Sequence, residues 1–262
     1  MSQRTTLRSR PIAWAGAAVL VALIAGGGFG LWYLFLRPSG PAPVSISNVP
    51  LSTASGAAPA TAAGSAPATS PGSSGSTGSL DGTWKVDQNV GSFSDFSGSF
   101  VGYRVQEQLA SIGAKTAVGR TPDVTGSITL QGSTVSAGTF TADLTTLESD
   151  DSRRDGQLRR QGIQTSQFPS ATFTFTQPIV LGTLPADGAS IKATVTGDFT
   201  LHGVTRSVQI PLQARRSGNE IAVTGSLPIA FADYWIEKPS SFVVLSIDDH
   251  GTMEFQLLFT KG

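Results

Sequence analysis

The chain has 262 residues, and its 18 basic side chains balance its 18 acidic ones. It contains no cysteine, which excludes disulfides, thiolate metal sites and cysteine nucleophiles. Residues 1–80 hold four basic and no acidic side chains, so the rest of the chain is mildly acidic. Such a domain is a poor partner for nucleic acid, whose phosphates need clusters of Lys and Arg.

The N-terminal region predicts a membrane anchor. Ile12–Leu36 is a run of 25 residues without a charge, and a helix of that length spans about 37 Å, enough to cross a hydrocarbon core of about 30 Å with some tilt. Arg4, Arg8 and Arg10 precede it, which favours a cytoplasmic location for residues 1–11. We therefore expect a single-pass cell-membrane protein with an extracytoplasmic C-terminal domain. The alternative is a cleaved signal peptide and a secreted domain.

The next segment, residues 37–80, predicts a disordered linker. Pro, Ala, Gly, Ser and Thr dominate it, and no charged residue follows Arg37. Such a composition buries too little apolar surface to offset the entropy of ordering. As a flexible coil it would reach about 35–40 Å. Its simplest role is a spacer that lifts the following domain off the membrane, and attachment of O-glycans to its Ser and Thr side chains is the other.

The domain at residues 81–262 shows apolar and polar residues in alternation. This period of two is typical of strands with one apolar and one solvated face. Short breaks containing Gly, Pro or Asp-Gly separate about eight such runs. They include Phe140, Phe173, Phe199, Val208, Ile221 and Phe255. We expect an all-β antiparallel sheet, closed into a barrel or folded as a sandwich. A closed barrel has no free sheet edge, so we expect a monomer.

One segment departs from this alternation and predicts a single short helix of about ten residues. Ser152 with Asp155 has the spacing of a capping box, and Gly162 is a natural stop. Asp155 and Arg159 have the spacing of an i,i+4 ion pair. The arginines of this helix would form a solvated face, or alternatively bind an anionic group.

Three segments resemble the YceI-like family. SRRDGQLRR at Ser152–Arg160 matches that family's helical R-D-x-H-L-R pattern, with Gln in place of His. FPSATF at Phe168–Phe173 matches its Y-P-x-A-T-F. VTGDFTLHGVTRSV at Val195–Val208 matches its G-x-L-T-[LI]-x-G-V-T-[KR]-P-V, apart from Phe199 and Ser207. The resemblance implies an elongated, lipocalin-like eight-stranded barrel that holds a polyisoprenoid chain, such as a quinone or a polyprenyl lipid.

A barrel of about eight strands either fills with its own side chains or holds one slender ligand. Burying about 400 Å² of isoprenoid tail is worth about 10 kcal/mol before the costs of binding. The rival hypothesis is a filled barrel without a ligand, acting as a structural or interaction module of the cell envelope. The alternation predicts inward side chains for a lipid cavity at Tyr103, Val105, Phe140, Leu144, Phe173, Phe175, Phe199, Leu201 and Leu257.

The irregular segment Phe231–Phe242 follows these strands. Trp235 within it is a candidate gate for the lipid, so we add it to the predicted cavity residues. The alternative is a plug that packs over one end of the core.

Little in the sequence points to catalysis. There are two histidines, and we expect both in turns: His202 beside Gly203, and His250 in the DDHG of a hairpin turn. A metal site at Asp248, Asp249 and His250 is the alternative. No G-x-S-x-G elbow or phosphate-binding glycine loop occurs. We therefore expect a protein that is not an enzyme and has no cofactor or metal beyond a bound isoprenoid lipid.

Overall fold

The computed structural model describes residues 40–51, 79–110, 113–239 and 244–262. The predicted cytoplasmic segment 1–11 and the predicted anchor Ile12–Leu36 lie outside these ranges, as do residues 52–78 of the predicted linker. Within the part that is described, no helix has the length and hydropathy needed to cross a bilayer.

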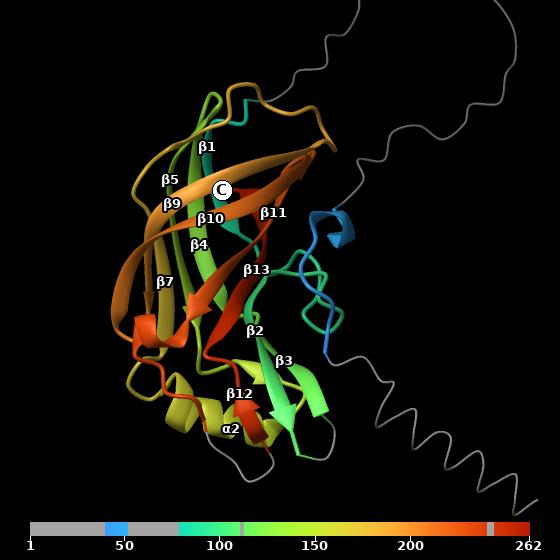
Figure 1. The fold of residues 1–262 in the computed structure, drawn as a ribbon. Coiled ribbons are helices and arrows are strands. Elements are labelled where there is room, and N and C mark those ends of the chain that lie inside the picture. The colour runs from blue at the N-terminus through green and yellow to red at the C-terminus, as the bar shows by residue number, and fades with distance from the viewer. Residues whose placement is uncertain (1–39, 52–78, 111–112, 240–243) are drawn as a thin grey trace, which may run out of the picture.

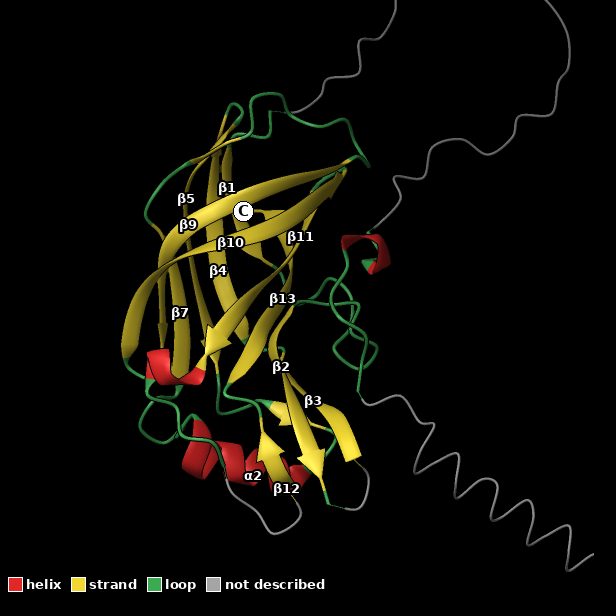
Figure 2. Ribbon diagram, in the orientation of Figure 1, coloured by secondary structure: helices red, strands yellow, loops and turns green. Residues whose placement is uncertain are grey.

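Eight antiparallel strands form a ring, in the order β1-β4-β5-β7-β9-β10-β11-β13 (Figures 1 and 2). Their bounds are β1 (Gly82–Val86), β4 (Val124–Gln131), β5 (Thr134–Asp143), β7 (Ser170–Phe175), β9 (Ser190–Leu201), β10 (Val204–Ser217), β11 (Glu220–Ala230) and β13 (His250–Lys261). The ring closes because β1 pairs with β4 on one side and with β13 on the other. The prediction of an eight-stranded antiparallel barrel is confirmed.

Five further strands extend this ring. They are β2 (Phe100–Leu109), β3 (Gly113–Thr121), β6 (Glu148–Ser149), β8 (Ile179–Val180) and β12 (Val244–Ile247). The C-terminal part of β13 pairs with β1, whereas its N-terminal part pairs with β2, which in turn pairs with β3. Thus β2 and β3 continue the wall beyond β1, towards the lower end of the barrel in Figure 1.

The predicted hairpin at the DDHG sequence is wrong. Both β12 and β13 pair with β2, as two successive stretches of one interrupted strand. Asp248 and Asp249 fill the interruption, and the Asp248 N–H donates to the carbonyl of Gln106 at 3.0 Å. A polar break between two alternating runs has the same sequence signature in a hairpin and in a bulged strand, which is why the sequence did not separate them.

One short helical segment lies at the barrel end that also carries β12, which we call the helix end (Figure 2). It consists of α2 (Ser152–Gln157) followed directly by a π-helical turn, η3 (Leu158–Gly162). The predicted capping box is wrong in its residues, because Asp151 is the N-cap and accepts from the Arg153 and Arg154 N–H groups. The carboxylate of Asp155 instead accepts from Ser149 Oγ at 2.6 Å, which ties the helix to β6.

Two of the four arginines of this segment make internal contacts, whereas Arg153 and Arg160 are exposed, as the predicted solvated face requires. Arg154 pairs with Glu107 of β2 and with Asp150, each at 2.6 Å. Arg159 donates to the Leu147 carbonyl at 3.1 Å and not to Asp155, its predicted partner. These contacts hold the helix against the end of the sheet.

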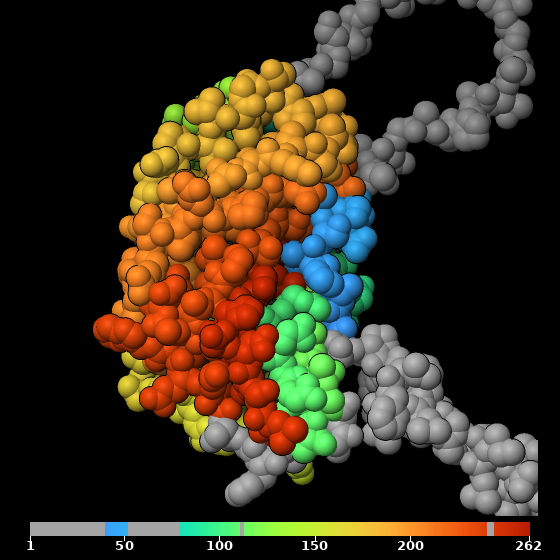
Figure 3. Space-filling view, viewed as in Figure 1, coloured from blue at the N-terminus to red at the C-terminus, as the bar shows by residue number. Residues whose placement is uncertain are grey.

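Residues 40–51 form a strap on the outer face of the barrel, where Figure 3 shows them lying between the β10–β11 side and the β2–β3 side. Within the strap, η2 (Ile46–Asn48) is a single 3-10 turn. Ile46 and Val49 are 5% and 2% exposed, and they pack on Ala222 and Leu258. This part of the predicted disordered linker is therefore ordered, because a few spaced apolar residues suffice when a matching apolar face is available.

Arginines of the barrel fasten the strap through its backbone carbonyls. Arg104 donates to Pro41 O at 2.7 Å, Arg120 donates to Ala42 O at 3.0 Å, and Arg215 donates to Val49 O. Arg120 is itself buried in an ion pair of 2.7 Å with Glu254 of β13. The outer face beneath the strap is therefore a packed layer and not a solvated surface.

Candidate functional site

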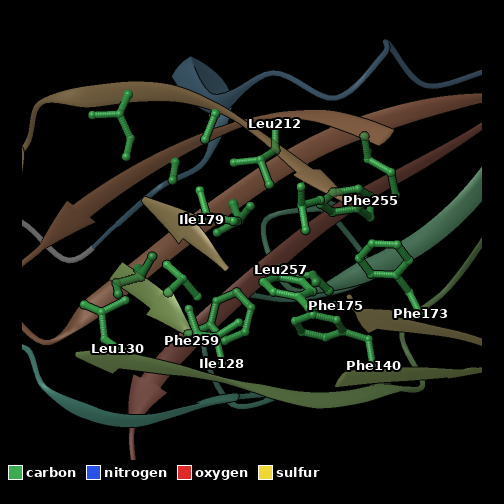
Figure 4. A pocket seen from close by; sticks show the side chains of 18 of the residues that line it. Ile128, Leu130, Phe140, Phe173, Phe175, Ile179, Leu212, Phe255, Leu257 and Phe259 are labelled. Atoms are coloured by element: carbon green, nitrogen blue, oxygen red, sulfur yellow. The ribbon is translucent and has the colours of Figure 1, made fainter. Parts of the chain in front are cut away.

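The barrel encloses an apolar cavity of about 160 Å³. Side chains of β4, β5, β7, β9, β10, β11 and β13 form its wall, which is apolar except for Thr172, Arg215 and Arg216. In Figure 4, Leu212 of β10 and Ile128 of β4 lie on opposite sides of it. Since its lining offers few polar partners, this space is suited to hydrocarbon and not to water.

Glycines explain why aromatic rings leave this space open. Four rings of the wall lie on a glycine of the neighbouring strand: Phe140 on Gly126, Phe175 on Gly138, Phe173 on Gly197 and Phe255 on Gly225. A Cβ at Gly138 would lie only 2.8 Å from the ring of Phe175. With glycine at these positions each ring can lie flat along the wall, so it occupies less of the lumen.

The cavity reaches the barrel end away from α2. Leu80, Leu184 and Pro185 line it there together with Arg216, which follows the inward-facing Leu212 and Ala214 of β10. The Arg216 guanidinium lies 3.1 Å from the carboxylate of Asp187 and donates to Gly218 O at 2.9 Å. We call this end the mouth. The charge of Arg216 is therefore neutralised by Asp187, which lies in the connection between β8 and β9.

The helix end of the barrel is filled. A cluster of buried side chains there includes Leu144, Leu147, Ile163, Ile229 and Tyr234. Tyr234 packs edge-on against Phe199 with ring centroids 5.8 Å apart. The barrel interior is therefore filled with side chains towards α2 and hollow towards the mouth.

Five of the predicted cavity residues line the cavity. They are Phe140, Phe173, Phe175, Phe199 and Leu257. They come from β5, β7, β9 and β13, which lie together around the hollow part of the barrel. Whether they contact a lipid stays a prediction.

Leu144 and Leu201 point inward but lie elsewhere. Leu144 belongs to the cluster that fills the helix end, and Leu201 packs against that cluster at the end of β9. Both follow the alternation of inward-facing residues. Their position along the barrel axis, however, places them in the packed part of the interior and not beside the cavity. They therefore support the floor of the cavity and do not line it.

Tyr103 and Val105 lie on β2, beside the lower half of β13. The ring of Tyr103 covers Gly119 of β3, and its burial raises the pKa of the hydroxyl above its ordinary value. Val105 packs against Gly251. Both lie outside the cavity, because only the start of β2, at Val101, reaches the cavity wall, and these two residues lie further towards the helix end.

Trp235 is 75% exposed and does not line the cavity. It follows η4 (Phe231–Tyr234) in the left-handed conformation, with φ of 53°. That backbone turn points the side chain of Trp235 outward while Tyr234 enters the core. The described part of the Phe231–Phe242 segment thus packs over the helix end, which is far from the mouth. The sequence did not distinguish these positions because alternation stops in this loop.

The aliphatic half of the cavity wall was missing from the prediction. It includes Ile128, Leu130, Ile179, Ile191, Ile210, Leu212 and Val223. The same alternation marks several of these as inward. Without the strand order, however, the sequence does not reveal which inward residues share the hollow part of the barrel.

The two histidines lie in different surroundings. His202 is in a turn as predicted, with φ of 52°, but it is buried: its ring lies 4.3 Å from that of Phe168, and its Nδ1 is 2.9 Å from Tyr234 O. His250 is exposed, and its hydrogen bond with Asp249 raises the pKa of the imidazole. Among the described residues no three His, Asp or Glu side chains gather in a group that could hold a metal ion.

Comparison with known proteins identifies a matching protein family. A family model described as YceI-like domain matches residues 84–259. A UPF0312 protein of Vibrio parahaemolyticus is 29% identical over 115 residues, which are 41% of this chain and 57% of that protein, so the match spans less than two thirds of the relative.

Solved structures are similar at lower identity. A domain from Saccharophagus degradans, described as a polyisoprenoid binding domain implicated in plant cell wall breakdown, is 21% identical, with a TM-score of 0.49 over 63% of this chain and 94% of that one. Burkholderia cenocepacia BcnA is 20% identical, with a TM-score of 0.49 over 66% and 98%. A Campylobacter jejuni YCEI protein is 16% identical, with a TM-score of 0.45 over 55% and 84%.

Proposed function

Because the chain belongs to the YceI-like domain family, we propose that it binds an isoprenoid or a similarly slender lipid in the apolar cavity. The observation that carries this proposal is the combination of an almost wholly apolar wall with aromatic rings lying on glycines. Core packing in proteins normally leaves few voids larger than a water molecule. An apolar void of about 160 Å³ is costly to maintain unless something apolar occupies it.

The size of the cavity defines how a lipid would fit. A dry cavity of about 150 Å³ accepts a molecule such as benzene, so the volume of about 160 Å³ takes a short hydrocarbon segment. A longer tail would extend through an opening of the barrel or move the rings of Phe175 and Phe255 apart. Each additional Å² of buried tail contributes about 25 cal/mol.

We also propose that the protein is tethered to the membrane by Ile12–Leu36, with the barrel outside the cytoplasm. The strap supports a short tether in place of the long spacer that the linker composition suggests. The strap begins at Gly40, four residues after the predicted span ends, and four residues extend over at most about 14 Å. The barrel would therefore lie close to the bilayer surface, where a lipid tail has little water to cross.

Lipid extraction tests the binding proposal. Full-length protein purified in detergent is extracted with organic solvent, and co-purified lipid is identified by mass spectrometry. The same protein is then incubated with ubiquinone-2, and the bound quinone is counted after gel filtration. We expect a stoichiometric prenyl lipid or near-stoichiometric uptake of the quinone.

Two variants make this test specific to the cavity. Ala214→Phe places a ring in the lumen near the mouth, whereas the adjacent Gln213→Phe lies on the alternate face of β10. We expect uptake to be lost in the first and kept in the second. Equal uptake in both would locate the lipid outside the barrel, and no lipid in any form would favour the structural or interaction module.

A further inference from the structure

The barrel wall contains a seam. Strand β7 ends at Phe175. Three residues later comes Pro178, which has no backbone N–H and so cannot continue the hydrogen-bond ladder. The chain resumes as β8, where Ile179 pairs with Val135 of β5 and Val180 with Thr134. Thus β8 stays on the β5 side of the wall after the pairing of β7 with β9 has stopped.

Strand β9 has a free edge opposite β8. Its C-terminal part pairs with β7 in a register that sets Phe175 opposite Gly197. Continued past Pro178, this register would set Val180 opposite Lys192. The Thr176 N–H still donates to Thr196 O at 3.1 Å, but among the described residues the part of β9 before Thr196 has a ladder with β10 and none with β8. The ring of eight strands is closed, but away from α2 the strands β8 and β9 lie near each other without a ladder of hydrogen bonds between them among the described residues.

The seam lies between two spaces. Outside it is a recess of about 420 Å³ lined only by Pro178–Leu181 and Ile191–Thr194. Inside it is the apolar cavity, and four side chains line both spaces: Ile179, Leu181, Ile191 and Ala193. A single layer of aliphatic side chains, without a backbone ladder, thus separates the cavity from the outside.

The rim of the recess has an amphipathic character. Val180 is 72% exposed, which is unusual for a large aliphatic residue on this protein. Lys192 and Thr194 are exposed on the facing strand. The backbone groups of β9 that face β8 take part in no strand ladder among the described residues, so they add hydrogen-bond donors and acceptors. Apolar contacts are therefore available to a tail, and polar contacts to a head group, at the same opening.

We propose that the lipid enters and leaves the cavity sideways, through the seam between β8 and β9, and that its polar head group stays in the outer recess beside Lys192. This inference rests on the proposed lipid-binding function and specifies the route. A lateral route admits the tail along its length, so the head group never crosses the apolar lumen. At the mouth, in contrast, Arg216 is already paired with Asp187.

A free edge can also accept a strand from a second chain. Pro178 and the charged Lys192 lie at the edges of this seam, and both disfavour pairing with a strand of another chain. The lipid route is therefore the use that fits the side chains of this seam better.

Cross-linking tests the route. The chain has no cysteine of its own, so Val180→Cys with Lys192→Cys in the full-length protein creates one defined pair across the seam. A short bismaleimide then joins the two strands. The matched control is Asp198→Cys with Ser207→Cys, which joins β9 to β10 at two exposed residues that are already opposite each other and lie outside the recess. Uptake of ubiquinone-2 is followed in time before and after linking.

We expect linking across the seam to slow uptake by about tenfold or more, and to slow release to the same degree when the quinone is loaded first. The control pair should change both rates by less than about twofold. An unchanged rate in the protein linked across the seam would overturn the lateral route, because it would mean entry through the mouth. Absence of quinone uptake by the unmodified protein would instead reject the lipid-binding function itself.

A second variant covers the case in which the double variant folds poorly. Val180→Trp adds bulk at the exposed lip without adding a link. It should slow uptake while leaving the final amount of bound quinone unchanged. A rate equal to that of the unmodified protein would contradict the proposed entrance.

Discussion

Single side chains decide whether the interior of this barrel is hollow. The ring of Phe175 can lie along the wall because Gly138 on the next strand has no Cβ. The backbone of Gly138 is not in the left-handed region, so alanine fits there by conformation and conflicts only with the ring.

Gly138→Ala should therefore push the ring of Phe175 into the lumen. We expect the affinity for ubiquinone-2 to fall by about tenfold and the free energy of unfolding to fall by about 1–3 kcal/mol through overpacking. Binding titrations and urea unfolding measure the two effects. Thr139→Ala, on the exposed face of the same strand, is the control, and an unchanged affinity in Gly138→Ala would mean that the ring does not limit the cavity.

One buried ion pair also stabilises the outer layer that the strap forms on the barrel. Arg120 and Glu254 are 4% and 1% exposed. The Arg120 guanidinium also lies 4.2 Å from the centroid of the Phe100 ring and 4.4 Å from that of Phe96. Its charge is thus enclosed by a carboxylate, two rings and the strap carbonyl of Ala42.

Glu254→Gln should lower the free energy of unfolding by about 3 kcal/mol, because it leaves the buried charge of Arg120 without its counter-ion. Chemical denaturation checks this value, and Glu148→Gln on the exposed side of β6 should cost less than about 0.5 kcal/mol. A loss of less than about 1 kcal/mol in Glu254→Gln would show that the aromatic rings and the carbonyl stabilise the guanidinium without the carboxylate.

At the scale of elements, the strap and the seam are the two departures from a simple barrel. The strap adds a layer over β11 and β13 through Ile46 and Val49. The seam removes a ladder between β8 and β9 after Pro178. The strap thickens the wall on one side, and the seam leaves a single layer of side chains between the cavity and the outer recess.

Val49→Ala should weaken the docking of the strap. Removing two buried methyl groups is expected to cost about 2 kcal/mol, counting the transfer term and a small cavity. Limited proteolysis of full-length protein should then cut within residues 40–51 faster than in Ser47→Ala, whose side chain is exposed. Equal cutting rates would mean that the arginine contacts alone hold the strap.

At the scale of the whole molecule, a lipid in the cavity and the stability of the barrel are linked. A ligand that binds only the folded state adds about 2.7 kcal/mol when its concentration is 100 times its Kd. For a domain of this size each kcal/mol raises Tm by about 2–4 °C.

Loading with ubiquinone-2 at that ratio should therefore raise Tm by about 5–10 °C. Calorimetry or thermal circular dichroism measures the shift. Ala214→Phe, which fills the lumen, should show no shift, while Gln213→Phe should keep it. A similar rise of Tm in both variants would mean that the quinone stabilises the protein from its surface, or through the detergent, and not from the cavity.

The alternation along the chain predicted an all-β antiparallel fold with about eight main strands, because a period of two is a local property that does not depend on which strands become neighbours. The resemblance to a family then selected the barrel over the sandwich. The sequence also identified the family, through the segments Ser152–Arg160, Phe168–Phe173 and Val195–Val208, and it marked as inward the five phenylalanine and leucine side chains that line the cavity. The order of residues along each strand carried this information.

Which inward residues contact packed core and which line the cavity depends on the three-dimensional arrangement of the strands. Leu144 and Phe140 have the same phase on the same stretch of chain, but one fills the helix end and the other lines the cavity. The docking of Ile46 on Leu258, the bulge at Asp248 and the seam at Pro178 likewise depend on which strands become neighbours. Pairing between distant segments is set by the whole packed arrangement, and a local pattern of side chains does not encode it.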